Sequence, residues 1–278
     1  MRTFTAALVA SGVLAASHVT CAGAEDASEW MRDAHSAIRL LAGSRAGNVL
    51  LGGVEVQLEN GWKTYWRTPG DSGVPPRFDF SRSDNVEKVT ILFPAPMAFN
   101  DGGGGVSFGY DKHVVLPLRI VPKDTSKPVT LRGELNYAVC QKLCLPVEAR
   151  AEIAFTNSAS TQDGVLTAAL NSLPKPAQIG DGGSLALRRV VREDRRVIAD
   201  VLVSDPKQQA ARVSLFAEGP TPDWALPVPK AAPPSPAGEV RFAFELDGLP
   251  PGAKSDGATL KLTLVGADEA YEYNVTLD

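Results

Sequence analysis

Apolar and polar residues alternate along most of this chain with a period of two, the period of a β-strand that buries one face. The alternation is clear in the second half of 48–58, and it returns at 62–66 after the turn signal Asn60-Gly61. Prolines and glycines predict an ordered loop from Arg67 to Pro76. We predict strands at 48–58, 62–66, 86–92, 113–120, 129–138 and 149–155. Short strands between regular turn signals are typical of an antiparallel sandwich.

A polar segment divides the chain into two parts. Residues 156–184 are small and polar, include Pro174 and Pro176, and have room for one short helix at 164–173, so we expect them to link two domains. Beyond them we predict strands at 185–191, 196–203, 211–217, 240–246, 259–265 and 271–277. The pattern thus predicts an all-β fold with antiparallel sandwiches in tandem, at 25–155 and 185–278. Residues 29–42 fit either a helix or an irregular lead-in strand.

The first 24 residues have the pattern of an export signal. Arg2 supplies the positive start, residues 6–16 are apolar or small, and Ala22-Gly23-Ala24 is a cleavage site of small residues. We expect a soluble, exported mature chain that starts near Glu25 and has lost Cys21 with the signal. No later stretch approaches the roughly 18 uninterrupted apolar residues of a membrane span, so we expect no stable membrane insertion.

Composition and charge indicate a globular protein and argue against nucleic acids and other polyanions as partners. The 278 residues are 44% hydrophobic and 22% charged, which is enough apolar sequence to bury a core. The net charge of −4 and the sequence pI of about 5.5 argue against a polyanionic partner. Lysines and arginines do not cluster among aromatic residues, so we expect no nucleic-acid binding.

Cys140 and Cys144 are the two cysteines of the predicted mature chain, with three residues between them. A disulfide that closes so short a loop contributes only about 2 kcal/mol by the chain-entropy argument. The spacing therefore favours a chemically reactive cysteine pair, and a local structural disulfide is the alternative. Thiol–disulfide exchange needs one thiolate that attacks a partner disulfide and a nearby thiol that resolves the mixed disulfide. Lys142 could favour a thiolate, although a solvated turn lysine is the simpler interpretation.

Other chemistries fit the same cysteines less well. A zinc site needs three or four ligands, and the predicted mature chain has only two histidines, His35 and His113. Cys140 and Cys144, with His113 or Met97, would suit Cu(I), because thiolates are soft ligands. A copper-handling protein that holds Cu(I) is therefore the alternative function, and an adhesion-type sandwich with one local disulfide is a third. We expect no cofactor.

A glycine run interrupts the strand pattern of the first sandwich. The predicted loop contains Asn100, Asp101, Gly102, Gly103, Gly104 and Gly105. Glycine has no side chain to restrict the backbone, so we expect a mobile segment. It lacks the G-K-[ST] ending of a phosphate loop. The loop is therefore either a flexible hairpin tip or a lid over a reactive group.

Several motifs follow one another in the first predicted sandwich: Gly61-Trp62-Lys63-Thr64-Tyr65-Trp66, Phe93-Pro94-Ala95-Pro96, Ser107-Phe108-Gly109-Tyr110, Leu116-Pro117-Leu118, and Tyr137-Ala138-Val139-Cys140 with Cys144-Leu145-Pro146-Val147-Glu148. Together they resemble the N-terminal periplasmic domain of the DsbD family of thiol:disulfide interchange proteins. The closer match is the ScsB branch, which is linked to suppression of copper sensitivity and carries a second sandwich. The resemblance covers residues 45–155.

The resemblance implies immunoglobulin-like sandwiches, with Cys140 and Cys144 as the redox pair and 100–107 as a cap loop. It implies a component of a protein-disulfide reductase, in which electrons come from a membrane-embedded donor and leave to periplasmic thioredoxin-fold proteins. Because the sequence ends at Asp278 without a membrane domain, we expect the donor to be a separate protein. Cys144 follows the turn, whereas Cys140 ends a strand, so we expect Cys144 to face the partner, as the resemblance also implies.

The sequence departs from the family pattern in two places. The best-known members space their cysteines more widely, and their cap carries a bulky aromatic residue where this chain has glycines. We expect the glycine loop to control access to the cysteines without being chemically required.

Overall fold

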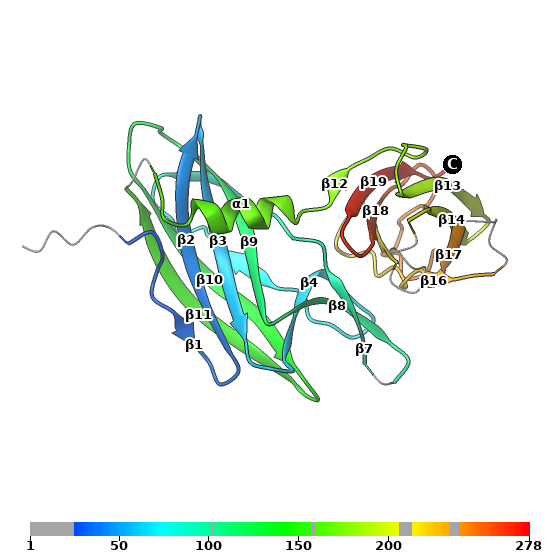
Figure 1. Cartoon of the computed structure of the whole chain (residues 1–278), viewed down its shortest axis with the longest axis horizontal. Coiled ribbons are helices and arrows are strands. Elements are labelled where there is room, and N and C mark those ends of the chain that lie inside the picture. The colour runs from blue at the N-terminus through cyan, green and yellow to red at the C-terminus, as the bar shows by residue number, and fades with distance from the viewer. Residues whose placement is uncertain (1–24, 102, 157–158, 206–212, 234–238) are drawn as a thin grey trace, which may run out of the picture.

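The computed structural model describes residues 25–101, 103–156, 159–205, 213–233 and 239–278. Within them the chain forms two largely antiparallel β-sandwiches in tandem, as predicted, with a helix against the first (Figure 1). The predicted export signal, Cys21 and Gly102 lie outside the described residues. None of the helices in the described part of the chain has the length and apolar character needed to cross a membrane.

The first sandwich consists of two antiparallel sheets. One has the order β1-β2-β3-β9-β6, with the bounds Met31–Arg32, Ser36–Ala46, Val49–Leu58, His113–Pro122 and Val86–Ile91. The other has the order β11-β10-β4-β8-β7, with the bounds Cys144–Phe155, Val129–Cys140, Lys63–Gly70, Val106–Asp111 and Met97–Asn100. A short strand, β5 (Arg77–Asp79), also pairs with β10.

The core of the first sandwich lies between these sheets. In β10, Val129, Leu131 and Leu135 are fully buried. The residues that alternate with the buried face, Thr130, Arg132 and Glu134, are partly exposed. Trp66 from β4 and Leu118 from β9 join the same cluster. Burying a large apolar side chain stabilises a fold by about 1.5–3 kcal/mol. Because a slip of one residue would turn this whole face outward, the buried face fixes the pairing register.

Residues 29–42, which fit a helix or a strand in the sequence, contain β1 and the first part of β2 in the structure. The ambiguity has a physical cause, because most of β2 is buried on both faces. Ile38 and Leu40 belong to the core cluster, whereas Leu41 packs on the helix α1 (Asp163–Asn171). A strand that is covered on both faces has no clean alternation to reveal its period.

The predicted connector contains this helix. α1 lies against the sheet of β2, β3 and β9 (Figure 1), and its Leu166 is fully buried there. Gly43 and Gly53 make room for it, since Cβ atoms at these positions would lie 2.5 and 2.8 Å from Leu166 methyl groups. The Asp163 carboxylate accepts a hydrogen bond from the backbone N–H of Ser44 (2.8 Å), which anchors the first helical turn to the sandwich.

The second sandwich also has two sheets. One has the order β12-β19-β18-β15, with the bounds Lys175–Pro176, Ala270–Thr276, Thr259–Val265 and Ser214–Glu218. The other has the order β13-β14-β17-β16, with the bounds Leu185–Glu193, Arg196–Val203, Glu239–Glu245 and Lys230–Ala231. Its core lies between them and includes Leu187, Val201, Phe244, Leu262 and Tyr273.

The structure also contains strands that the alternation does not predict. β7 and β8 flank the glycine run and pair as a hairpin, so that the predicted loop connects its two strands. β11 begins at Cys144 rather than at 149, because its first residues already pair with the end of β10. The cysteine segment is therefore a continuous hairpin.

Candidate functional site

A disulfide closes the hairpin between β10 and β11. Cys140 is the last residue of β10 and Cys144 the first of β11, and the two are direct partners in the ladder. Their Cα atoms lie 4.2 Å apart and their sulfur atoms are bonded at 2.02 Å. In the exposed turn, the Gln141 N–H donates to the Leu143 carbonyl oxygen (3.2 Å). Cross-strand partners bring their Cβ atoms together, so local hairpin geometry assembles the predicted pair.

The two cysteines have different surroundings. Cys140 is 2% exposed, because β10 is flanked by β11 on one side and by β4 on the other, where Lys63 is its partner. Cys144 is exposed at the start of β11, an edge strand. The neighbouring Leu143 is 75% exposed. Cys144 is therefore the more accessible cysteine of the pair.

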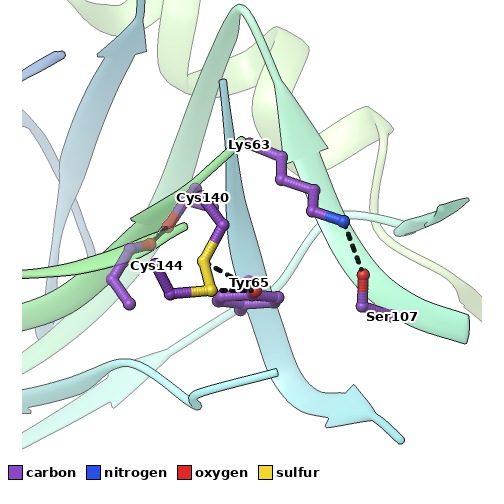
Figure 2. Close-up of a disulfide and its surroundings, with 7 residues drawn as sticks. Lys63, Tyr65, Ser107, Cys140 and Cys144 are labelled. Atoms are coloured by element: carbon purple, nitrogen blue, oxygen red, sulfur yellow. Dashed lines mark hydrogen bonds between the residues drawn. A yellow bond between two sulfur atoms is a disulfide. The ribbon is translucent and has the colours of Figure 1, made fainter. Parts of the chain in front are cut away.

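Tyr65, from β4, lies against the disulfide (Figure 2). Its hydroxyl donates a hydrogen bond to Cys140 Sγ (2.8 Å) and lies 3.1 Å from Cys144 Sγ. The residue is 4% exposed, and burial raises the pKa of the hydroxyl. The hydroxyl therefore stays protonated at neutral pH and remains a donor. A donor in this position would stabilise negative charge on either sulfur after reduction.

Pairing of β4 with both of its neighbours holds Tyr65 in place. The Thr64 hydroxyl donates to the Ala138 carbonyl oxygen of β10 (2.9 Å). On the other side, Tyr65 pairs with Gly109 of β8, where a Cβ atom would lie only 1.8 Å from the Thr64 carbonyl oxygen. The sequence places Tyr65 in a strand but does not identify it as a site residue, because the contact joins residues 75 positions apart.

The predicted cap loop is held as a turn around Asp101. The Asp101 carboxylate accepts hydrogen bonds from the N–H groups of Gly103 (2.8 Å) and Gly105 (2.9 Å). These bonds, the one from Gly103 foremost, lower the pKa of the carboxyl. The Val106 N–H donates to Asp71 Oδ2 (2.9 Å), in the loop that follows β4. Asp101 thus holds Gly103 and Gly105 in a turn, and the mobility of the loop and its role as a cap stay predictions.

Lys63 joins the β7–β8 hairpin to the strand that carries Tyr65. Its ammonium group donates to Ser107 Oγ (3.0 Å; Figure 2) and lies 5.2 Å from the centre of the Phe99 ring. Ser107 is completely buried. The structure thus places the base of the predicted cap beside the strand that contacts the disulfide, a contact that the sequence does not indicate.

The remaining predicted site residues lie apart from this cluster. Lys142 is exposed in the turn between the cysteines. His113 lies on β9 in the other sheet, with its Nε2 atom 2.8 Å from Glu55 Oε1, and Met97 is half-exposed on β7. Among the residues that the structure describes, no group of three or more His, Cys, Asp or Glu side chains is arranged to hold a metal ion.

Comparison with known proteins adds to this geometry. Residues 35–156 match the family model described as thiol:disulfide interchange protein DsbD, N-terminal. The crystal structure of the N-terminal periplasmic domain of ScsB from Proteus mirabilis matches with a TM-score of 0.72 and 20% identity, over 91% of this chain and 98% of that one. The yeast GGA1 GAE domain has a TM-score of 0.27 and 8% identity over 45% of this chain and 97% of its own. No curated protein sequence matches the chain.

Proposed function

Because residues 35–156 belong to the DsbD N-terminal domain family, we propose that this protein is a thiol–disulfide interchange module, which passes electrons between redox proteins through Cys140 and Cys144. The observation that supports the proposal is the Cys140–Cys144 disulfide together with its surroundings, namely the short turn it closes, the Tyr65 hydroxyl and the unequal exposure of the two cysteines. It closes a turn of three residues, which contributes little stability, and both sulfur atoms share the Tyr65 hydroxyl. One cysteine is buried and the other exposed. This arrangement suits a reactive disulfide better than a structural one.

In the proposed reaction, the Cys144 thiolate of the reduced protein attacks one sulfur of a partner's disulfide. A mixed disulfide forms, and the partner's other sulfur leaves as a thiolate. The Cys140 thiolate then attacks Cys144 Sγ, which forms the Cys140–Cys144 disulfide and releases the partner as a dithiol. Two electrons and two protons thereby pass from the module to the partner. The exposure of Cys144 and the burial of Cys140 support this order of attack.

Tyr65 supplies the electrostatic part of the proposed mechanism. The thiolate, rather than the thiol, is the nucleophile in exchange. Because the Tyr65 hydroxyl lies within hydrogen-bond reach of both sulfurs, it can donate to whichever sulfur carries the charge at each step. Hydrogen bonds to a charged group are worth about 1.5–3 kcal/mol, so this donor would favour the thiolate form of the pair.

The proposal extends to the setting of the protein. We propose that it acts in the periplasm after cleavage near Ala24, with thioredoxin-fold proteins as partners and a separate membrane protein as electron donor. We propose 25–155 as the redox domain, 185–278 as the second domain and 156–184 as their connector. α1 of this connector packs on the first sandwich, and β12 pairs with β19 of the second.

An exchange assay tests the proposed function. The reduced protein is mixed with an oxidised thioredoxin-fold protein, the mixture is quenched with acid, and free thiols are tagged with a maleimide and counted by mass. We expect two thiols to disappear from this protein as two appear on the partner. A double variant, Cys140→Ser with Cys144→Ser, controls for non-specific oxidation. If the folded wild-type protein transfers no electrons, the proposed function is wrong.

A further inference from the structure

The second sandwich contacts β4 at Arg67, two residues after Tyr65. The regular pairing of β4 with β8 is interrupted between Tyr65 and Gly70. Arg67, in this segment, donates from Nε and Nη2 to both carboxylate oxygens of Glu218 (2.9 and 2.6 Å), and from Nη2 to Glu272 (2.7 Å). The Thr68 hydroxyl donates to the same Glu218 carboxylate (2.7 Å). Glu218 lies in β15 and Glu272 in β19, so two strands of the second sandwich bind one arginine of the first.

An aromatic contact continues this interface. Phe216 of β15 is 1% exposed and packs within the core cluster of the first sandwich. Its ring centre lies 5.5 Å from that of Trp66 in β4 and 4.3 Å from that of Phe108 in β8, the latter pair edge to face. The Arg67 guanidinium lies 4.3 Å from the Trp66 ring centre. Bidentate ion pairs and buried ring contacts favour a fixed arrangement over two domains on a flexible tether.

This interface depends strongly on Arg67. The side chains of Arg67, Glu218 and Glu272 are 24%, 14% and 25% exposed. Burial by itself lowers the pKa of Arg67, but the hydrogen bonds and charges of Glu218 and Glu272 outweigh it and raise that pKa. Removing the guanidinium would leave the Glu218 carboxylate largely buried without its two charge-assisted hydrogen bonds. Loss of one partner from such a pair is strongly destabilising.

The strands that bind the second sandwich also form the surroundings of the disulfide. Arg67 follows Tyr65 by two residues in β4, and Phe108 directly follows Ser107, the partner of Lys63, in β8. A displacement of the second sandwich would therefore act on β4 and on the base of the β7–β8 hairpin together. These are the elements that contact the sulfurs and hold the predicted cap.

We propose that Arg67 is a positioning residue: by clamping the second sandwich to β4 and to the β7–β8 hairpin, it sets the reactivity of the Cys140–Cys144 pair. The inference rests on the proposed function and gives a role to the second sandwich, whose residues 185–278 include no cysteine or histidine. While docked, the second sandwich keeps Tyr65 against the sulfurs and the hairpin base in place. Release of the clamp lets these elements move and exposes the thiols.

The test compares Arg67→Met with the wild type in the full chain. Small-angle X-ray scattering reports docking, and two readouts report on the site: the rate at which iodoacetamide alkylates the reduced thiols, and the redox equilibrium constant with glutathione. We expect Arg67→Met to extend the molecule, to accelerate alkylation and to shift the equilibrium constant, the last two by about 2-fold to 30-fold. Arg132→Met is the matched control, because Arg132 also pairs with two carboxylates, Asp84 and Glu152, but within the first sandwich.

Arg67→Lys provides a second variant in case Arg67→Met does not fold, since lysine keeps the charge but lacks the bidentate fork. It should shift both site readouts in the same direction by a smaller factor, and Arg132→Met should leave them near wild type. Extension of the molecule with unchanged alkylation and equilibrium constant would overturn the proposal, as would unchanged scattering in both variants. A wild-type protein that fails the exchange assay would refute the proposed function, whereas scattering and alkylation would still decide the role of the clamp.

Discussion

β10 and β11 are two strands of one hairpin with the same length of 12 residues, but they lie in different places in the sheet. β10 lies inside the sheet, paired on one side with β11 and on the other with β4 and β5, and ends at a cysteine that is 2% exposed. β11 forms the sheet edge and begins at an exposed cysteine. Its exposed charged residues, Glu148, Arg150 and Glu152, are typical of an edge protected against further pairing.

The difference shows how a short cysteine spacing can produce two unequal sulfurs. The turn between them sets only their separation. Their exposure is set by what lies beside each strand: β4 covers Cys140, and solvent borders Cys144. Thiol–disulfide exchange benefits from this difference in exposure. One sulfur must be accessible to a partner, whereas the other resolves the mixed disulfide within the protein.

The largest expected effect is on the trapping of a partner. Cys140→Ser removes the proposed resolving thiol, so a covalent complex with an oxidised thioredoxin-fold protein should accumulate through Cys144. Cys144→Ser should trap little, because Cys140 is buried. Non-reducing electrophoresis measures both. The opposite pattern would reverse the roles of the two cysteines, and no complex from either variant would count heavily against exchange.

A stability comparison tests the inside and edge positions directly. Leu131→Ala in β10 removes a fully buried side chain and should lower the free energy of unfolding by about 2–5 kcal/mol. Leu145→Ala in β11 changes a side chain that is 37% exposed and should cost less than about 1 kcal/mol. Urea denaturation of the oxidised protein measures both values. Equal losses would show that the inner strand and the edge strand contribute alike to the free energy of unfolding, and would contradict the expected difference.

Tyr65→Phe should destabilise the thiolate form of the reduced cysteines while leaving the fold intact. Without the hydroxyl, the thiolate loses a hydrogen bond worth about 1.5 kcal/mol or more, so the lowest thiol pKa of the reduced protein should rise by about one. The absorbance of the thiolate near 240 nm, followed against pH, measures it. Tyr110→Phe is the matched control, because the Tyr110 hydroxyl donates to the Pro94 carbonyl oxygen instead of to a sulfur. An unchanged thiol pKa in Tyr65→Phe would remove Tyr65 from the mechanism.

The smallest expected effect comes from shortening the predicted cap. Deletion of Gly103 and Gly104 should change the alkylation rate of the reduced thiols by less than about tenfold, the equivalent of 1.4 kcal/mol, and should preserve the circular dichroism of the fold. Deletion of Gly182 and Gly183, which are exposed at the start of the second sandwich, is the control and should leave the rate unchanged. If both deletions leave the rate unchanged, the glycine loop is only a hairpin tip.

The predictable parts of the fold are the strands with one buried face. The alternation of β10 and of β18 appears directly in the sequence, because their inward residues face a core and their outward residues do not. β2 could not be assigned, since α1 covers its second face. β7 and β8 were not predicted because they are short and flank a glycine run. β7 pairs with β8, and β8 is joined to the rest of the sheet by the distant strand β4.

At the site, the sequence could identify the cysteines but not their neighbours. Cys140 and Cys144 are close in sequence, so a local turn is enough to predict that their sulfurs meet. Tyr65 reaches them, and Arg67 reaches Glu218, only after distant strands have packed. Long-range contacts of this kind leave no periodic signal in the chain, and they require the structure.

The central claim, that Cys140 and Cys144 form an exchange-active pair, is tested most directly by a redox titration of the purified mature protein. The protein is equilibrated in glutathione buffers of graded potential, and its free thiols are counted after acid quenching. We expect a reduction potential in the range of exchange-active pairs, about −180 to −270 mV. A potential far below about −300 mV would mark a structural disulfide and contradict the account.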